Sequence, residues 1–324
     1  RQRDAQPCLV PAEIGPRRST RARAALALRS RGRLRYRASL ALYPGIPRSE
    51  DRVTSEERDF FRANGYLSLG QIVEGDELAR MVEVFDRDRA ETAKDHWYKF
   101  GHWQSVNCDA VFTSPEFDEL IRHPKAMAYL AEIMGDDICF SELCARHMGP
   151  YDGELDRGWH RDRGHWSEHP LRVDYMQLMV YLTDVHEGTH CFSISPESVD
   201  EDVLGNEAQL ERGGVVDIHG PAGTGLLFNV AVLHTATTRA TQAERKTAQV
   251  YYGFTHRPHL SEDSLMPPAL WRDHPDAETR RFYGLLNGKT RDYMDVVEER
   301  GELSLDDAQA ALRELDVKHG RRRA

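Results

Sequence analysis

Two potential metal ligands lie two residues apart near the middle of the chain. His160 and Asp162 lie in the segment GWHRDRGHW, residues 158–166. In an extended segment, residues i and i+2 point to the same side, so both side chains can reach one ion while Arg161 points away. A second imidazole from another strand would complete a 2-His-1-carboxylate triad, which leaves three positions of an octahedral iron(II) open. A lone H-x-D pair is a weak signal, because a solvated charged loop explains it equally well.

The candidate for the second imidazole is His234, which closes the apolar stretch LLFNVAVLH. Arg245 follows eleven residues later and opens the next β-type segment. A hairpin would return Arg245 to the neighbourhood of His234, where a guanidinium could bind the far carboxylate of a dicarboxylic co-substrate that chelates the metal. The alternatives are a satisfied core histidine for His234 and a surface cation for Arg245.

The elements that must position these residues begin with helices. The segment TSEERDFFRANGY offers Thr54 as N-cap with Glu57 in a capping box, an apolar face from Phe60 and Phe61, and a stop at Gly65. Further helical patterns cover 75–91 with Asp76 as the cap, 114–135 with a break before Pro124, and 304–315.

Between the helical regions the periodicity changes to that of short strands rich in β-branched and aromatic residues. These segments are 138–148, 173–185, 189–196, 214–220, 224–236 and 246–257. No amphipathic helix of 10–15 residues separates them, so a parallel βαβ sheet is disfavoured and an antiparallel sandwich or barrel is expected. The sequence therefore predicts a mostly β fold with flanking helices.

The HRD triplet at 160–162, a histidine about seventy residues on and an arginine eleven after it resemble the phytanoyl-CoA dioxygenase family of iron(II)/2-oxoglutarate-dependent oxygenases. The segment FFRANGYLSLGQIVEGDELARM is similar to the opening of that family, and MVYLTDVHEGTHCFSISPES to the part after its H-x-D. The resemblance covers about residues 52–260 and implies a double-stranded β-helix core (a cupin-like jelly roll) with the metal at its mouth.

The resemblance also implies the cofactors. His160, Asp162 and His234 would bind Fe(II), which also binds 2-oxoglutarate and dioxygen, and Arg245 would pair with the distal carboxylate of 2-oxoglutarate. Because Asp162 is present, hydroxylation of an unactivated C–H bond is favoured over halogenation, with release of succinate and carbon dioxide. Two alternatives remain: a zinc-dependent hydrolase on the same ligands, and a non-catalytic jelly-roll metal-binding protein.

Further site residues are weaker candidates. The family often has Ser or Thr two residues after the distal histidine, where this chain has Ala236, so Thr235 or Thr237 could supply the second contact to 2-oxoglutarate. Arg146 lies on the strand entering the site and could hold a co-substrate or substrate anion, although a surface cation is the simpler interpretation. Trp166 could form a wall of the substrate pocket, although tryptophans more often belong to the core.

Charge divides the chain of 324 residues, whose formal net charge is −10. Residues 1–50 contain twelve arginines against three acidic residues, so the rest is strongly acidic. We expect this basic segment to be disordered, with a transit peptide or sequence upstream of the true start as alternatives. Residues 51–260 are expected to form the dioxygenase domain with its N-terminal helices, and 261–324 a helical extension packed on it.

Composition also limits compartment and partners. The five cysteines include no C-x-x-C pair, and no apolar run approaches the roughly 20 residues that span a bilayer, so we expect a cytoplasmic protein that binds no membrane. The acidic body and the scarcity of aromatic residues among the arginines argue against nucleic-acid binding. The expected partner is a small-molecule substrate. Arg157, Arg161 and Arg163 hint that it is anionic, with a solvated loop as the alternative.

Overall fold

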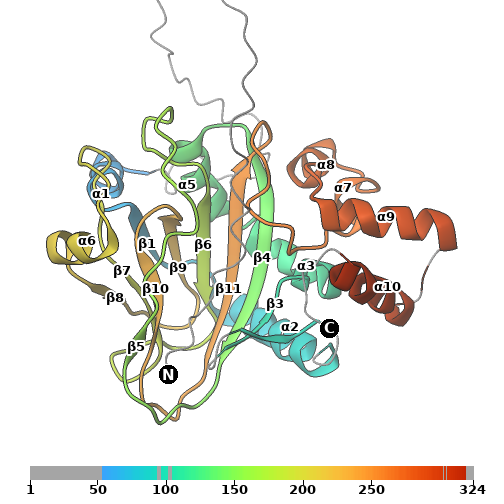
Figure 1. Cartoon of the computed structure of the whole chain (residues 1–324), viewed down its shortest axis with the longest axis horizontal. Helices are drawn as coiled ribbons and strands as arrows, with labels where there is room; N and C mark the ends of the chain where they lie inside the picture. Colours follow the sequence, from blue (N-terminus) through green and yellow to red (C-terminus); the bar gives the residue numbers. More distant parts are fainter. Residues whose placement is uncertain (1–52, 93–95, 101–103, 302, 304, 319–324) are drawn as a thin grey trace, which may run out of the picture.

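The structure is a computed structural model that describes residues 53–92, 96–100, 104–301, 303 and 305–318. Within these residues two antiparallel sheets form the centre of the molecule (Figure 1). The larger sheet has the order β1 (Tyr66–Gln71), β9 (Thr224–Asn229), β6 (Met176–Tyr181), β11 (Arg245–Phe254), β4 (Ile138–Met148), β3 (Gln104–Asn107) and β2 (Tyr98–Phe100). The smaller sheet has the order β5 (Asp156–Arg157), β10 (His234–Thr238), β7 (Cys191–Ile194) and β8 (Val216–Ile218).

Helices flank this pair of sheets as predicted. They are α1 (Ser55–Asn64), α2 (Gly75–Glu91), α3 (Ala110–Thr113), the 3-10 turn η2 (Pro115–Phe117), α4 (Asp118–Ile121), α5 (Pro124–Met134), α6 (Asn206–Gly213), α7 (Pro268–Trp271), α8 (Ala277–Tyr283), α9 (Gly288–Arg300) and α10 (Leu305–Lys318). Figure 1 shows α7–α10 beyond β4, on the side away from the small sheet. None of the helices in the described part of the chain has the length and apolar character needed to cross a bilayer.

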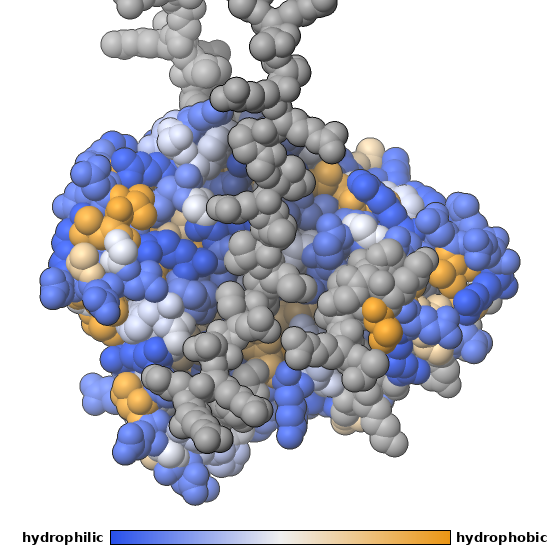
Figure 2. Space-filling model, in the orientation of Figure 1, coloured by the Kyte–Doolittle hydropathy of each residue, from blue (hydrophilic) through white to orange (hydrophobic). Residues whose placement is uncertain are grey.

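Both faces of the large sheet are buried, which explains its apolar strands. On β6, Leu178 and Val180 belong to the core under the helices, whereas Met179 and Tyr181 belong to the second core between the two sheets. A strand buried on both faces lacks the usual alternation of polar and apolar residues. On the face drawn in Figure 2, the described surface is mainly hydrophilic and its apolar side chains form small separate patches.

Helix α1 forms where the capping signals predicted it. Thr54 accepts a hydrogen bond from the Glu57 amide, Glu57 bonds back to the Thr54 amide, and Gly65 ends the helix with φ of 75°. Phe61 is fully buried, but Phe60 is 42% exposed, so the prediction that both phenylalanines form the apolar face is wrong for Phe60. Adjacent residues lie about 100° apart around a helix, and only one of the two can face the core centrally.

The other observed helix and strand boundaries agree with the predicted ones in part. Strand β4 has the predicted bounds, and the helical stretch 114–135 breaks before Pro124 as expected. The cap of α2 is Glu74, without a side-chain hydrogen bond, so the prediction of Asp76 as the cap is wrong. The elements β2, β3, β5, α3, α6, α7 and α8 were not predicted, since none is longer than eight residues and such lengths give too little periodicity to detect. The 13-residue helix α9 was not predicted individually either, although it falls within the expected helical extension 261–324. The basic segment predicted at 1–50 lies outside the described residues.

The largest correction concerns the predicted strand 224–236. It consists of two strands in different sheets, β9 and β10, joined by a turn over residues 230–233. The apolar composition of that turn hid it, because the turn itself is buried between the sheets. Asn229 was the available signal: its side chain accepts a hydrogen bond from the Ala231 amide at 3.0 Å, the local bond by which asparagine starts turns. His234 therefore begins a strand rather than ending one.

Candidate metal centre and co-substrate pocket

The segments that carry the predicted ligands run side by side. His160 and His234 form an isolated antiparallel bridge, in which each amide donates to the other carbonyl at 3.0 and 2.9 Å. His160 Nε2 lies 3.5 Å from Asp162 Oδ1, and His234 Nε2 lies 3.6 Å from Asp162 Oδ2. The structure thus brings the three predicted ligands together, with one donor atom from each within 4.8 Å of the others.

The histidine rings are held in matching orientations. Nδ1 of His160 lies 2.7 Å from the Gly158 carbonyl, and Nδ1 of His234 lies 2.8 Å from the Val232 carbonyl. A carbonyl can only accept, so each Nδ1 carries the proton and each Nε2 keeps its lone pair for a metal. Both Nε2 atoms face the Asp162 carboxylate. Each ligand histidine therefore bonds to the carbonyl two residues before it, which fixes its tautomer.

Burial keeps His234 in the form that binds metals. Removal from water lowers the pKa of this imidazole to about 4, although the neighbouring Asp162 carboxylate acts in the opposite direction. The ring is therefore neutral near pH 7, as metal ligation requires. Two imidazoles and one carboxylate suit a divalent first-row metal such as iron(II). The donor set fits the predicted ion.

Tyr251 on β11 is a residue that the sequence analysis missed. Its hydroxyl donates to Asp162 Oδ2 at 3.3 Å, so it supports the orientation of the carboxylate ligand. Such outer hydrogen bonds hold metal ligands in position. Strand alternation indicates only that residues 245 and 251 share a face of β11; nothing in the sequence pairs Tyr251 with Asp162.

Arg245 lies at the start of β11 and is 2% exposed. Its Nη1 donates to the Cys191 carbonyl at 3.2 Å, and its guanidinium lies 5.6 Å from the centre of the Tyr181 ring. The remaining contacts are to two methionine sulfurs, Met148 at 3.4 Å and Met179 at 3.3 Å. The buried Nε has no hydrogen-bond partner, and burial lowers the pKa of the guanidinium.

No carboxylate within the described residues forms an ion pair with Arg245. A buried guanidinium that meets only a carbonyl, sulfur and an aromatic ring lacks the anionic partner that such groups normally have. Arg245 is also on the same wall of the sandwich as Tyr251, which touches the carboxylate ligand. This places a cation suited to an external anion on the wall that supports the metal centre.

Arg146 lies on the strand next to Arg245. The β4–β11 register pairs it with Thr247, so its side chain is on the same face as that of Arg245. It is partly buried, its guanidinium lies 5.0 Å from the Phe100 ring centre, and its Nη1 donates to Gln104 Oε1 at 3.4 Å. Its predicted role toward an anion stays a prediction.

Thr235 and Thr237 point to the face of β10 opposite His234, because side chains alternate along a strand. The Thr235 hydroxyl donates to the Ala236 carbonyl at 3.1 Å, and the Thr237 hydroxyl accepts from Arg157 at 3.0 Å. Their predicted contact with 2-oxoglutarate has no support from this geometry. Alternation places Thr238, and neither Thr235 nor Thr237, on the same face of β10 as His234.

Trp166 packs at the edge of the helix-side core. Its ring is 5.4 Å from that of Phe254 and stacks on His169 at 5.8 Å between ring centres. The Arg257 guanidinium covers it at 4.7 Å. A substrate contact for Trp166 stays a prediction beside these structural roles.

The three arginines that hinted at an anionic substrate are already engaged. Arg157 bonds to Asp217 at 2.8 Å, Arg161 bonds to Glu197 at 2.5 Å, and Arg163 donates to the Leu260 carbonyl. Each of these side chains therefore has a partner within the chain, and their role toward an anionic substrate stays a prediction.

Two further groups of potential metal ligands occur in the described part of the chain. In the first, Cys108, Glu142 and Cys144 are buried; burial raises the pKa of Glu142, and the bond with Cys144 raises that of Cys108. A raised pKa disfavours the deprotonated form that binds a metal, although the bond with Cys108 lowers the pKa of Cys144.

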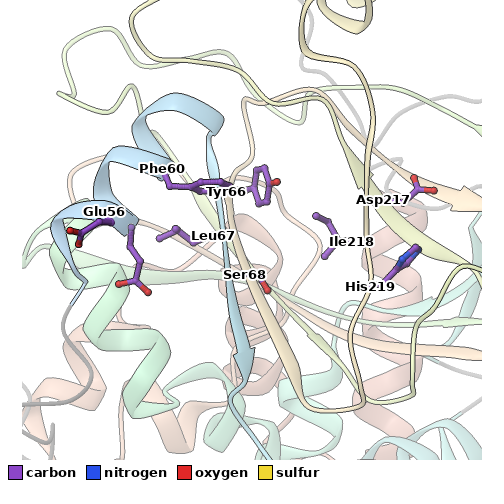
Figure 3. A pocket seen from close by; sticks show the side chains of 9 residues that line it. Glu56, Phe60, Tyr66, Leu67, Ser68, Asp217, Ile218 and His219 are labelled. Carbon is purple, nitrogen blue, oxygen red and sulfur yellow. The ribbon is translucent and has the colours of Figure 1, made fainter.

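The second group comprises Cys191, Asp217 and His219. Asp217 accepts from Arg157 and Arg239 at 2.8 and 2.7 Å, so its charge is already balanced. Asp217 and His219 border an open hollow of about 500 Å³ between α1, β1 and β8 (Figure 3). None of the residues lining this hollow is one of the three metal-ligand candidates His160, Asp162 and His234.

Known proteins support the fold inferred from this geometry. AviO1 from Streptomyces viridochromogenes Tue57 matches 62% of this chain and 94% of its own at 21% identity and a TM-score of 0.51. EctD from S. alaskensis, solved with bound Fe, matches 69% of this chain and 85% of its own at 18% identity and a TM-score of 0.54. HygX from Streptomyces hygroscopicus, solved with nickel and 2-oxoglutarate, matches 65% and 92% at 18% identity and a TM-score of 0.50.

These likenesses confirm the jelly-roll core. A search of curated protein sequences finds no match. The family model described as phytanoyl-CoA dioxygenase (PhyH) matches residues 61–247, more than half of the chain and all three metal-ligand candidates together with Arg245. The chain therefore belongs to the phytanoyl-CoA dioxygenase family of iron(II)/2-oxoglutarate-dependent oxygenases, as its sequence predicted.

Proposed function

We propose that this enzyme hydroxylates an unactivated C–H bond of a small-molecule substrate. One oxygen atom of dioxygen would enter the product as a hydroxyl group, and the other would enter succinate as 2-oxoglutarate loses carbon dioxide. The four electrons that reduce dioxygen come in equal parts from the C–H bond and from 2-oxoglutarate. The observation that carries the proposal is Arg245: a buried cation without a carboxylate partner in the described residues, on the strand that also carries Tyr251, which touches the ligand Asp162.

Each residue of the site has a separate proposed role. His160, Asp162 and His234 would hold iron(II), which when bound supplies the activation of dioxygen. Arg245 would bind the distal carboxylate of 2-oxoglutarate by a two-point contact. We also assign Arg146, on the same face, to an anionic group of the co-substrate or the substrate. The Met148 and Met179 side chains around Arg245 exclude water from this ion pair, which strengthens it.

The cofactor assignment has support from related structures. EctD was solved with bound iron, and HygX with nickel and 2-oxoglutarate. The donor set of this chain fits the same type of ion, since both free Nε2 atoms face one carboxylate. We therefore propose Fe(II), 2-oxoglutarate and dioxygen as the cofactor and co-substrates.

Anaerobic spectroscopy tests the proposal. Fe(II) and then 2-oxoglutarate are added to the full chain, and the visible metal-to-ligand charge-transfer band is recorded. We expect the band with 2-oxoglutarate and none with succinate, which lacks the 2-oxo group needed for chelation. An Asp162→Ala variant serves as the control. If the wild-type protein produces no band, the iron/2-oxoglutarate assignment fails.

The substrate requires a second experiment. A panel of small molecules is screened under air for succinate released above the level without substrate. Mass spectrometry of the active compounds then shows whether the product gains one oxygen atom. A product without added oxygen would contradict hydroxylation while leaving the cofactor assignment intact.

A further inference from the structure

We infer that Glu197 is a positioning residue that holds the two ligand-bearing segments of the metal centre in register. The inference rests on the iron site of the proposed function. Glu197 follows β7, and its side chain is only 2% exposed. Within the described residues it is a buried carboxylate that contacts both segments of the centre without being one of the three ligands.

The contacts of Glu197 divide between the two segments. Oε1 accepts from the Leu233 amide at 2.8 Å and from Arg161 Nη2 at 2.5 Å. Leu233 directly precedes the ligand His234, and Arg161 lies between the ligands His160 and Asp162. One carboxylate oxygen therefore joins the main chain of one segment to the side chain of the other.

The second oxygen adds to the link. Oε2 lies 3.3 Å from His165 Nε2, three residues beyond Asp162. The main chain of Glu197 is itself fixed, because its amide donates to the Asn64 carbonyl at the end of α1 at 3.2 Å. Two residues earlier, the Ser195 amide donates to the Leu233 carbonyl at 2.9 Å. Glu197 is thus a rigid anchor for the Arg161 segment.

The electrostatics favour the charged form of this anchor. Burial opposes ionisation of Glu197, but the hydrogen bonds from His165 and the Leu233 amide and the charge of Arg161 outweigh it and lower its pKa. The carboxylate is therefore ionised near pH 7. Arg161 is 14% exposed and also donates to Asn206 Oδ1 at 3.0 Å. A buried charge pair of this kind fixes geometry, because either partner alone would be poorly accommodated.

The consequence concerns the metal rather than the fold alone. The Arg161 side chain points away from the metal centre and bonds to Glu197. The side chains of His160 and Asp162 on either side of it point toward the metal centre as ligands. Without the carboxylate, the 160–162 segment keeps its main-chain bonds to 230–234 but loses the attachment of Arg161 to the segment that follows β7. Outer-shell substitutions of this kind typically lower metal affinity 10- to 100-fold. We expect the same loss of Fe(II) affinity here.

The test measures the Fe(II) dissociation constant of the full chain under anaerobic conditions by competition with a chromophoric chelator. Glu197→Ala is expected to weaken binding about 10- to 100-fold. Glu197→Gln should lie between it and wild type, because the amide oxygen can still accept from Leu233 but carries no charge for Arg161. The charge-transfer band with 2-oxoglutarate should shift or broaden in both variants.

The matched control is Asp109→Asn. Asp109 is a carboxylate of comparable burial, 6% exposed, whose ion pair with Lys289 at 2.7 Å belongs to another part of the fold. This variant should lose stability but keep the Fe(II) affinity and band of the wild type. A fall of Fe(II) affinity in the control as large as in Glu197→Gln would show that loss of stability alone explains the effect, and would overturn the inference.

Arg161→Met removes the other, more exposed partner of the Arg161–Glu197 ion pair. It should also weaken Fe(II) binding, and the Glu197→Gln/Arg161→Met double variant should lose less than the product of the two single effects. Folded Glu197 variants with wild-type affinity would overturn the inference. If Glu197→Ala does not fold, a wild-type Fe(II) affinity in Arg161→Met would overturn the inference instead. If the wild-type protein itself binds no iron, it is the proposed function that fails.

Discussion

Replacement of Arg245 by alanine separates the co-substrate site from the metal site. The side chain contacts none of the three metal ligands directly; its partners are the Cys191 carbonyl, two methionine sulfurs and the Tyr181 ring. Iron binding should therefore persist in the variant. What disappears is the cation that would meet the distal carboxylate of 2-oxoglutarate.

The expected loss follows from the burial of this position. Leaving one member of a buried charge pair without its partner costs about 2–5 kcal/mol of binding. Arg245 is 2% exposed in surroundings of sulfur and an aromatic ring, so little water can compensate, and we expect the upper part of that range. A cost of about 3–5 kcal/mol corresponds to a fall in 2-oxoglutarate affinity of roughly 150- to 5,000-fold.

The assay is an anaerobic titration of the Fe(II)-loaded protein with 2-oxoglutarate, followed by the charge-transfer band. Arg245→Lys should recover only part of the affinity, because an ammonium group cannot make the planar two-point contact. Lys246→Met is the matched control: it removes the neighbouring cation, which pairs with Asp86 at 2.7 Å and Glu244 at 3.1 Å instead. Wild-type 2-oxoglutarate affinity in Arg245→Ala would refute the assignment, even with the iron site intact.

Two of the other three predictions concern the metal centre, and the third concerns a buried carboxylate in another part of the fold. Asp162→Ala removes the charged ligand and should abolish tight Fe(II) binding, as measured by metal content after gel filtration. Tyr251→Phe removes a hydrogen bond of 3.3 Å to the same carboxylate and should weaken Fe(II) binding by roughly tenfold in the chelator competition assay. At Asp109, burial opposes ionisation, but Lys289 and His96 outweigh it and hold the pKa below its usual 3.8. The stability that this carboxylate contributes is present above about pH 4 and is lost as the pH falls further, so denaturant unfolding of Asp109→Asn should vary less with pH in that range.

The ligand positions were predictable because they depend on local geometry. A spacing of two residues in an extended segment puts His160 and Asp162 on one side of the chain, and this holds whatever the tertiary fold. The hairpin predicted between His234 and Arg245 was wrong, because β10 and β11 lie in different sheets. Arg245 instead faces the small sheet, where its Nη1 donates to the Cys191 carbonyl. The ends of α1 were predictable for the same reason. The capping box at Thr54 and the stop at Gly65 each involve residues within about one turn of the helix.

Residues that act across the fold could not be found in this way. Glu197 meets Arg161 over 36 positions of sequence, and Tyr251 meets Asp162 over 89. No periodicity connects such partners, because the pairing of the sheets decides it. The division of 224–236 into β9 and β10 escaped for a related reason: a buried turn has the composition of a strand.

The main-chain bridge between His160 and His234 also bears on how such a chain can evolve. The bridge closes a stretch of more than seventy residues that contains β6, β7, α6, β8 and β9. Each doubling of a loop adds only about 0.6 kcal/mol of closure entropy. Insertions or deletions in the turns of this stretch can therefore reshape the entrance to the pocket without moving either imidazole, which would let the range of substrates diverge while the chemistry stays the same.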